Sequence, residues 1–221
     1  MQISPHTGSQ LVDLCSALLL LTCFAIVAQR RLSACVDLFA LQSAFLVLTA
    51  AVVAFLTGNH HIYIAAALTG VIKVVIIPRV LKKVIERLNV KRELVMNVNV
   101  PAGLLICGAL VMLAFFITQP IIPLGFLLTR DSLAIALAIV LIGFFTMIAR
   151  QKAVTQLVGF LVMENGLFLG ATAATYGMPL IVELGVFFDV LIAALIAGIY
   201  TNRLQDAFDN VDTNHLTVLK E

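Results

Sequence analysis

The polar positions of this chain are few, and they separate seven long apolar segments. These segments comprise residues 10–29, 33–56, 62–81, 102–119, 133–149, 156–175 and 179–200, and each consists mainly of Leu, Ile, Val, Ala, Phe and Gly. They are too long for the strands of a membrane β-barrel and lack the alternation of such strands. About 20 helical residues span a hydrocarbon layer roughly 30 Å thick. The pattern therefore predicts an all-α integral membrane protein with about seven transmembrane helices.

Prolines and a basic segment divide these helices into groups. Residues 79–94 carry apolar side chains at helical spacing among basic ones, which predicts an amphipathic extension at the cytoplasmic interface. Pro101, Pro120 and Pro123 bracket the fourth segment. We therefore expect three parts, which are an N-terminal three-helix group with this extension (1–100), two connecting helices (101–149), and a helix pair with a cytoplasmic tail (150–221).

The overall composition supports a membrane protein. Of the 221 residues, 62% are hydrophobic and 12% are charged, and the mean hydropathy is +1.09. A soluble domain needs a far more polar surface. The opening MQISPHTGSQ contains no Lys or Arg, so the first segment lacks the basic region of a secretory signal and is expected to remain in the mature protein.

The basic residues gather on one side of the predicted helices. All but two of the 14 Lys and Arg residues lie there; Arg130 falls in a loop on the other side, and Lys73 lies inside a segment. Lys and Arg accumulate in the cytoplasmic loops of membrane proteins. The N-terminus is therefore predicted outside and the C-terminus in the cytoplasm, in a multi-pass protein of the cell's inner (cytoplasmic) membrane.

The sequence gives no sign of a catalytic or cofactor-binding motif. The four cysteines form no CxxC pair, and no GxGxxG, P-loop, nucleophile elbow or HExxH is present. His60 and His61 fall in a short outer loop without further ligands nearby. We therefore expect no metal site, no cofactor and no active site in this chain. The net charge of +2 does not require a nucleic-acid partner.

At least four ionisable residues lie at membrane depth, and four of them are the candidates for chemistry. Glu164 is ~12 Å from the cytoplasmic start of its segment, and Lys73 is at a matching depth. Asp189 is ~16 Å from the cytoplasmic end of the last segment, and Glu183 lies closer to the outside. A charge at the centre of a membrane helix costs roughly 2.5–3.5 kcal/mol, so such groups usually serve a function. They are predicted to form part of a proton path.

A structural role for the same four groups remains open, because paired charges can simply fix the register of helices. Three carboxylates exceed the single lysine, which favours a carboxyl that changes its protonation state. Asp189 is the expected partner of Glu164, with Lys73 acting through a polar residue or water. Small residues at every fourth position, which favour close helix packing, are Gly166, Gly170 and Ala174.

Several of these stretches together resemble a known family. MENG (163–166), PLIVELGVFFDVLIAALI (179–196) and DNVDTNHLTVLKE (209–221) are similar to the hydrogenase-4 component E family, as are residues 30–48 and the lysine-bearing third segment. Members of that family are membrane subunits of group 4 NiFe-hydrogenase and formate hydrogenlyase type complexes. The resemblance covers almost the whole chain.

The last third also resembles the three-helix K-type subunit of respiratory complex I. The residues that match its basic turn, glycine, asparagine and second acid are Arg150, Lys152, Gly159, Asn165 and Asp189. The first acid of that subunit aligns with Leu161, and the carboxylate here follows three residues later, at Glu164. Residues three apart lie on nearly the same helix face. The resemblance thus implies a proton-path role for Glu164.

The resemblance implies a non-catalytic membrane subunit of a proton-translocating, complex I-related hydrogenase complex. Its partners would be antiporter-like and other membrane subunits, a soluble hydrogenase-like Fe–S arm reached through the complex, and the lipid bilayer. It would bind no nickel, Fe–S cluster or nucleotide of its own. A subunit of a multisubunit sodium/proton antiporter and a structural spacer of a membrane arm are the alternatives. The direction of the hydrogen reaction and the choice between protons and sodium stay open.

Overall fold

All regular elements of the described chain are helical. A computed structural model describes residues 5–57, 60–87, 98–120 and 130–175. The elements are α1 (Pro5–Ala28), α2 (Leu32–Thr57), α3 (His60–Gly70), the π-helix η1 (Val71–Ile76), α4 (Ile77–Arg87), α5 (Val100–Thr118), α6 (Arg130–Ala149) and α7 (Ala153–Thr175). The prediction of an all-α protein is confirmed for these residues.

Five of these helices are long and apolar enough to cross a membrane. They are α1, α2, α5, α6 and α7, and each coincides with a predicted segment to within a few residues. The third predicted segment, 62–81, corresponds to α3, η1 and α4, which follow one another without a break in the chain. The seventh, 179–200, lies outside the described residues. The number of seven and the orientation in the membrane therefore stay predictions.

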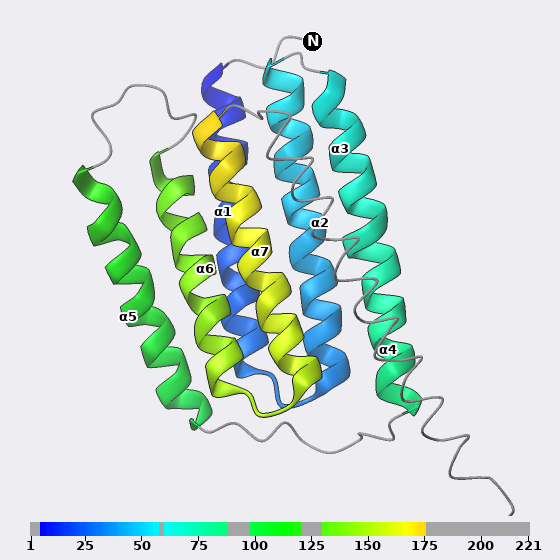
Figure 1. The fold of residues 1–221 in the computed structure, drawn as a ribbon. Coiled ribbons are helices and arrows are strands. Elements are labelled where there is room, and N and C mark those ends of the chain that lie inside the picture. Colours follow the sequence, from blue (N-terminus) through cyan, green and yellow to red (C-terminus); the bar gives the residue numbers. More distant parts are fainter. Residues whose placement is uncertain (1–4, 58–59, 88–97, 121–129, 176–221) are drawn as a thin grey trace, which may run out of the picture.

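The helices stand side by side in a bundle (Figure 1). α1, α2, α7 and α6 form its centre, where each packs against the next and α6 closes the ring on α1. α5 lies against α6 and α1 on one flank, and α3, η1 and α4 lie against α2 on the other. Large apolar side chains fill the centre, among them Phe39, Leu46 and Leu161, while α5 exposes Leu105, Met112 and Phe116. The exposed apolar surface suits a lipid environment.

Glycines bring α6 and α7 close together. A Cβ atom at Gly143 would lie 2.7 Å from the backbone nitrogen of Met163, and one at Gly166 would lie 2.8 Å from the backbone nitrogen of Val140. Gly170, one turn after Gly166, also faces α6, and Ala174 lies a further turn along α7. Since side chains larger than hydrogen do not fit at these crossings, the glycines set the distance between the two helices.

A proline explains the π-helical turn that carries Lys73. Pro78 has no backbone N–H, and in a regular α-helix its ring would collide with the carbonyl four residues earlier. In the structure the backbone N–H of Ile77 donates to the oxygen of Ile72, which is the wider π-type spacing. π-turns are rare and occur often at functional sites. The turn places the buried Lys73 near the middle of this flanking helix.

Apart from Lys73 and Arg130, the basic residues of the described chain lie at one end of the bundle, where Arg150 has a special position. It follows α6, is almost completely buried, and its Nη2 donates to the carbonyl oxygens of Ile26, Val27 and Gln29 at 2.9–3.2 Å. These carbonyls end α1, where a cation is favoured by the helix dipole. Burial lowers the pKa of this guanidinium, and the thiol of Cys35 opposes that shift. Arg150 thus ties the α6–α7 turn to the end of α1.

Candidate functional site

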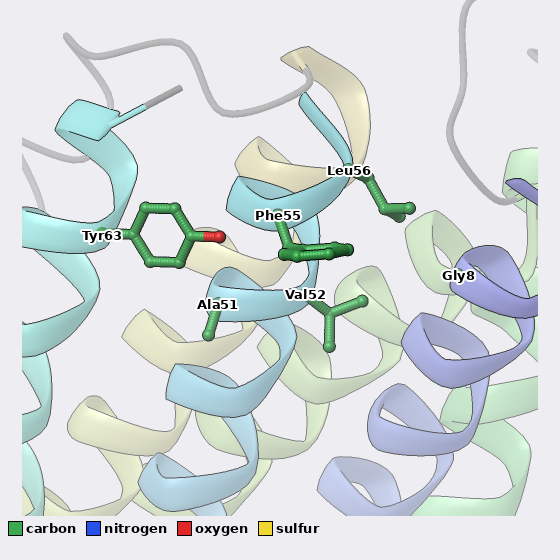
Figure 2. A pocket seen from close by; sticks show the side chains of 6 residues that line it. All are labelled: Gly8, Ala51, Val52, Phe55, Leu56 and Tyr63. Atoms are coloured by element: carbon green, nitrogen blue, oxygen red, sulfur yellow. The ribbon is translucent and has the colours of Figure 1, made fainter. Parts of the chain in front are cut away.

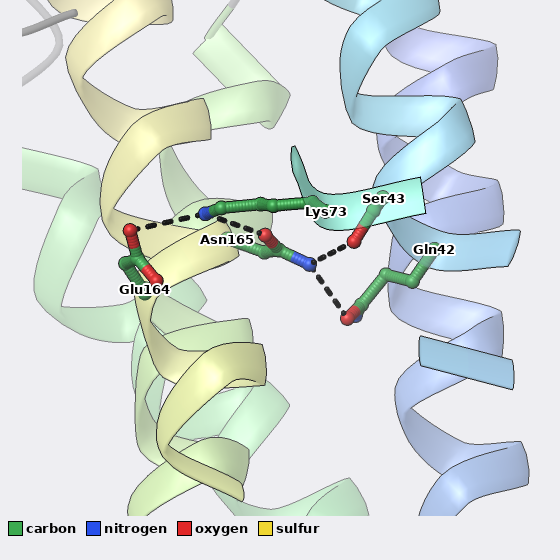
Figure 3. A network of polar contacts seen from close by, with 5 residues as sticks. All are labelled: Gln42, Ser43, Lys73, Glu164 and Asn165. Carbon is green, nitrogen blue, oxygen red and sulfur yellow. Dashed lines mark hydrogen bonds and ion pairs between the residues drawn. The ribbon is translucent and has the colours of Figure 1, made fainter. Parts of the chain in front are cut away.

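The candidate site centres on an ion pair between the π-helical turn and α7. Lys73 Nζ lies 3.1 Å from Glu164 Oε1, and the lysine side chain is fully buried while that of Glu164 is 7% exposed. Each residue lies near the middle of its helix, so the pair sits deep in the bundle (Figure 3). The contact is direct, contrary to the expectation that a polar residue or water lies between them. The structure therefore brings together two of the four predicted ionisable groups.

Asn165 connects this pair to α2. Lys73 Nζ also donates to Asn165 Oδ1 at 3.1 Å, and Asn165 Nδ2 donates to Gln42 Oε1 at 3.2 Å and to Ser43 Oγ at 3.3 Å (Figure 3). The ammonium fixes the orientation of the Asn165 amide, because only its oxygen can accept from Lys73. All the side chains of this network are buried.

Gln42 extends the network from α2 to α1. Its Nε2 donates to the carbonyl oxygen of Leu19 at 3.2 Å and to Cys23 Sγ at 2.8 Å. The hydrogen bonds therefore run from Glu164 on α7 to the backbone of α1. The four cysteines of the chain are free and buried, and Cys23 takes part as a hydrogen-bond acceptor.

Gln42 and Ser43 were not singled out from the sequence. Uncharged polar side chains occur in many membrane helices, and nothing in the spacing of QS within LFALQSAFLVL distinguishes these two. A signal exists in hindsight, since adjacent Gln and Ser in the middle of an apolar segment need buried partners. Those partners come from α7 and α1, which are distant in sequence.

The remaining predicted ionisable groups, Glu183 and Asp189, lie outside the described residues, so the expected Asp189–Glu164 pairing stays a prediction. Among the residues that the structure does describe, no three His, Cys, Asp or Glu side chains converge in a way that could hold a metal ion. The chemistry available at the described site is therefore that of an acid, an amine and amides. Lys73 and Glu164 can exchange a proton, because transfer from Nζ to Oε1 converts the ion pair to a neutral amine and a neutral acid.

A separate pocket at the far end of the bundle has a different character. It lies between α1, α2 and α3 near the ends opposite the basic residues, and its lining is Gly8, Ala51, Val52, Phe55, Leu56 and Tyr63 (Figure 2). Apart from the Tyr63 hydroxyl, no polar side chain lines it. It offers no group for acid–base chemistry and is not the candidate site.

Comparison with known proteins finds relatives that align over nearly the whole chain. An uncharacterized protein of Mycobacterium tuberculosis, Rv0085, is 36% identical over 96% of this chain and 97% of its own length. Hydrogenase-4 component E of Escherichia coli K12 is 26% identical over 97% of this chain and 99% of its own length. The protein of the same name from Shigella flexneri matches equally well. No protein-family model matches the chain, and no solved structure matches it significantly.

Proposed function

This chain belongs to the hydrogenase-4 component E family, and we propose that it is a non-catalytic membrane subunit of a proton-translocating hydrogenase complex. The buried network around Lys73 and Glu164 would form its part of the proton path. Family membership supports the assignment to a hydrogenase complex. The apolar helices support a location in the membrane, which we propose to be the cytoplasmic membrane.

The observation that carries the proton-path role is the direct contact of Lys73 with Glu164 at the centre of the bundle. Burial of charged side chains in a membrane helix is costly, so their retention there favours a function. When the Lys73–Glu164 pair carries no net charge, its two groups hold one transferable proton between them. Addition of a second proton gives a cationic pair of ammonium and carboxylic acid, and its loss restores the starting state.

Asn165 and Gln42 would hold this pair in place while its charge changes. Lys73 keeps an acceptor in Asn165 Oδ1 even when Glu164 is protonated. This partner limits the cost of separating the lysine from its counter-charge. Glu183, Asp189 and polar groups of other subunits would continue the path. We propose antiporter-like membrane subunits as the neighbours and a soluble Fe–S arm, reached through them, as the source of redox energy.

A structural clamp is the second candidate, and the same contact favours it. Lys73 and Glu164 join the flanking helix to α7 with opposite charges at 3.1 Å, which is a complete ion pair without any titration. Such a pair can define how helices assemble. In this case the chain would be a spacer of the membrane arm, and protons would cross elsewhere.

Glu164→Gln distinguishes the two functions when complex yield and proton translocation are measured on the same preparation. Glutamine keeps the size of the side chain and can still accept a hydrogen bond from Lys73, but it cannot ionise. A proton path predicts normal yield with translocation lost. A clamp predicts reduced yield, with normal translocation in whatever assembles. Normal yield with normal translocation contradicts both roles. Asp37→Asn is the matched control, since it removes an exposed carboxylate that pairs with Lys82 at the bundle surface.

A further inference from the structure

The flanking helix has an exposed face that changes from apolar to basic along its length. α3, η1 and α4 follow one another without a break beside α2 (Figure 1). Leu68, Val71 and Ile76 are 42–53% exposed, and the side chains of Arg79 and Lys83, which come next along the same helix, are exposed too. These five side chains are called the flank face below.

The π-helical turn keeps the flank face on one side of the helix. Val71 and Ile76 are five residues apart, a spacing that in a regular α-helix would turn them about 140° away from each other. η1 has the wider π-type spacing, which brings residues five apart close to one line. Ile72 and Ile77 have the same spacing, and both are buried on the side that packs against the bundle. The apolar and basic parts of the flank face therefore form one continuous strip.

The basic part of the flank face lies at the depth of lipid headgroups. Lys82, beside Lys83, pairs with Asp37 of α2. Asp37 is ~7.5 Å from the start of α2 along the helix axis, and α2, with 26 residues, is ~39 Å long. That length exceeds a hydrocarbon layer of roughly 30 Å by several Å at each end. The pair therefore marks a level close to the boundary between hydrocarbon and headgroups, and long basic side chains can extend from there toward phosphates.

The two cations of the flank face are available to an outside anion. Asp37 is already paired with Lys82. Within the described ranges, no ion pair joins Arg79 or Lys83 to a carboxylate. Glu86 is exposed one turn after Lys83 and lowers the positive charge at that end, whereas Arg79 is ~10 Å from Glu86 along the axis. The positive charge is therefore greatest at Arg79, where the apolar part of the face ends.

We propose that the flank face binds one anionic phospholipid, with its phosphate at Arg79 and Lys83 and an acyl chain along Ile76, Val71 and Leu68. The guanidinium of Arg79 can donate two parallel hydrogen bonds to a phosphate, and the ammonium of Lys83 adds a second positive charge. A phospholipid joins an anion to an apolar chain in the same order in which the face joins cations to apolar side chains.

This order favours a lipid over an acidic segment of another protein, which would match the basic part of the face alone. A zwitterionic lipid also fits less well, because its own cation offsets the attraction of its phosphate to Arg79. The proposal goes beyond the proton path and does not depend on it, since it needs the helices to cross a membrane and nothing more.

Native mass spectrometry of the purified full-length chain in detergent tests the lipid site. Phosphatidylglycerol and phosphatidylcholine with identical acyl chains are added separately, and the affinity of the first bound lipid is measured. We expect tighter binding of phosphatidylglycerol. Arg79→Gln and Lys83→Gln should each weaken that binding about fivefold and leave the binding of phosphatidylcholine unchanged. Equal affinity for the two lipids in the unsubstituted chain would overturn the proposal.

Arg31→Gln is the matched control, because it removes one exposed arginine at the same end of the bundle but outside the flank face. It should leave the affinity for phosphatidylglycerol unchanged. An equal loss in Arg31→Gln and Arg79→Gln would show a general attraction to positive charge and overturn the site. Inorganic phosphate should not displace the lipid at matched concentration, and displacement would show that the acyl chain adds nothing.

The assembled complex separates a lipid from an acidic partner protein. Lipids that remain bound through purification are extracted and quantified for the unsubstituted complex and for the double variant Arg79→Gln with Lys83→Gln. We expect the double variant to retain less phosphatidylglycerol while all protein subunits stay bound. Loss of a protein subunit with unchanged lipid content would overturn the proposal in favour of a protein at this face. Glu164→Gln should leave the lipid content unchanged whether or not it affects proton translocation.

Discussion

The ammonium of Lys73 and the carboxylate of Glu164 meet at 3.1 Å, and the segments that carry them, η1 and α7, both pack against α2. The lysine reaches α7 from a π-helical turn, and Asn165 on the next position of α7 binds the same ammonium. The ion pair, the amide and the turn therefore form one unit. Substitutions can test the effect of the charges in this unit separately from the effect of its packing.

Lys73→Met combined with Glu164→Leu removes both charges while it keeps most of the buried volume. Either single substitution leaves one buried group without its partner, at a cost of roughly 3–5 kcal/mol if that group stays charged. The double variant avoids this cost, so we expect the complex yield of Lys73→Met to be low and that of the double variant to recover. Yield and proton translocation are measured together. A proton path predicts that translocation stays absent in the double variant, and recovery of both contradicts the path.

Asn165→Leu interrupts the link between the ion pair and α2. Gln42 Oε1 and Ser43 Oγ then lose a buried donor, and Lys73 loses one acceptor. Each unsatisfied buried group costs about 1–3 kcal/mol. We expect a clear decrease in the midpoint of thermal unfolding of the purified chain. Thr172→Val is the control on the same helix, because its hydroxyl bonds to the carbonyl of Phe168 within α7. Equal midpoints in the two variants would mean that the network contributes no stability.

Most helix positions could be predicted because the thickness of the hydrocarbon layer fixes the length of an apolar segment. The six predicted segments between residues 10 and 175 all fall on helical elements. The π-turn could not be predicted in the same way. Pro78 indicates a disturbance of the helix, but a kink, an end and a π-turn all accommodate a proline. The choice depends on packing against α2, which the local sequence does not contain.

The candidate site was predictable where it is charged and not where it is neutral. Lys73 and Glu164 stand out because charges in apolar segments are rare. Gln42 and Ser43 gain their importance from partners on α7 and α1.

Gly166→Ala should loosen the contact between α6 and α7. The added Cβ would approach the backbone nitrogen of Val140 and the oxygen of Ala136 at less than 3.0 Å, so a helix has to move. Overpacking of this kind typically costs 1–3 kcal/mol. We expect a lower unfolding midpoint for the purified chain. Gly108→Ala on α5 is the matched control, since no atom lies within 4 Å of its added Cβ. A midpoint that decreases equally in both would argue against close packing as the cause.

The orientation of the chain in the membrane follows from charge placement and is testable with reporters. The described basic residues before α2, in α4 and after α6 all fall at one end of the bundle. The positive-inside tendency places that end in the cytoplasm. A reporter fused after Glu221 should therefore report a cytoplasmic location, and one placed before Gln10 an exterior location. The reverse pattern would contradict the predicted orientation.

Arg150 should stabilise the bundle through geometry as well as charge. Its Nη2 is shared by three carbonyls that end α1, and its side chain is buried between the α1–α2 and α6–α7 connections. Arg150→Met removes these bonds and leaves the carbonyls without their donor, which costs about 1.5–3 kcal/mol for a bond to a charged group. Arg150→Lys keeps the charge, but its ammonium is a compact point charge without the planar guanidinium, so we expect an intermediate unfolding midpoint.

Arg31→Met is the matched control, because it removes one exposed arginine at the same end of the bundle. Arg31→Met lowers the positive charge at this end of the bundle by the same amount as Arg150→Met, but it breaks no buried hydrogen bond. We therefore expect Arg31→Met to have the same unfolding midpoint as the unsubstituted chain. Arg150→Lys should unfold at a lower midpoint, and Arg150→Met at the lowest. If Arg31→Met unfolds as early as Arg150→Met, net charge at this end would account for the effect and the three carbonyl contacts would not.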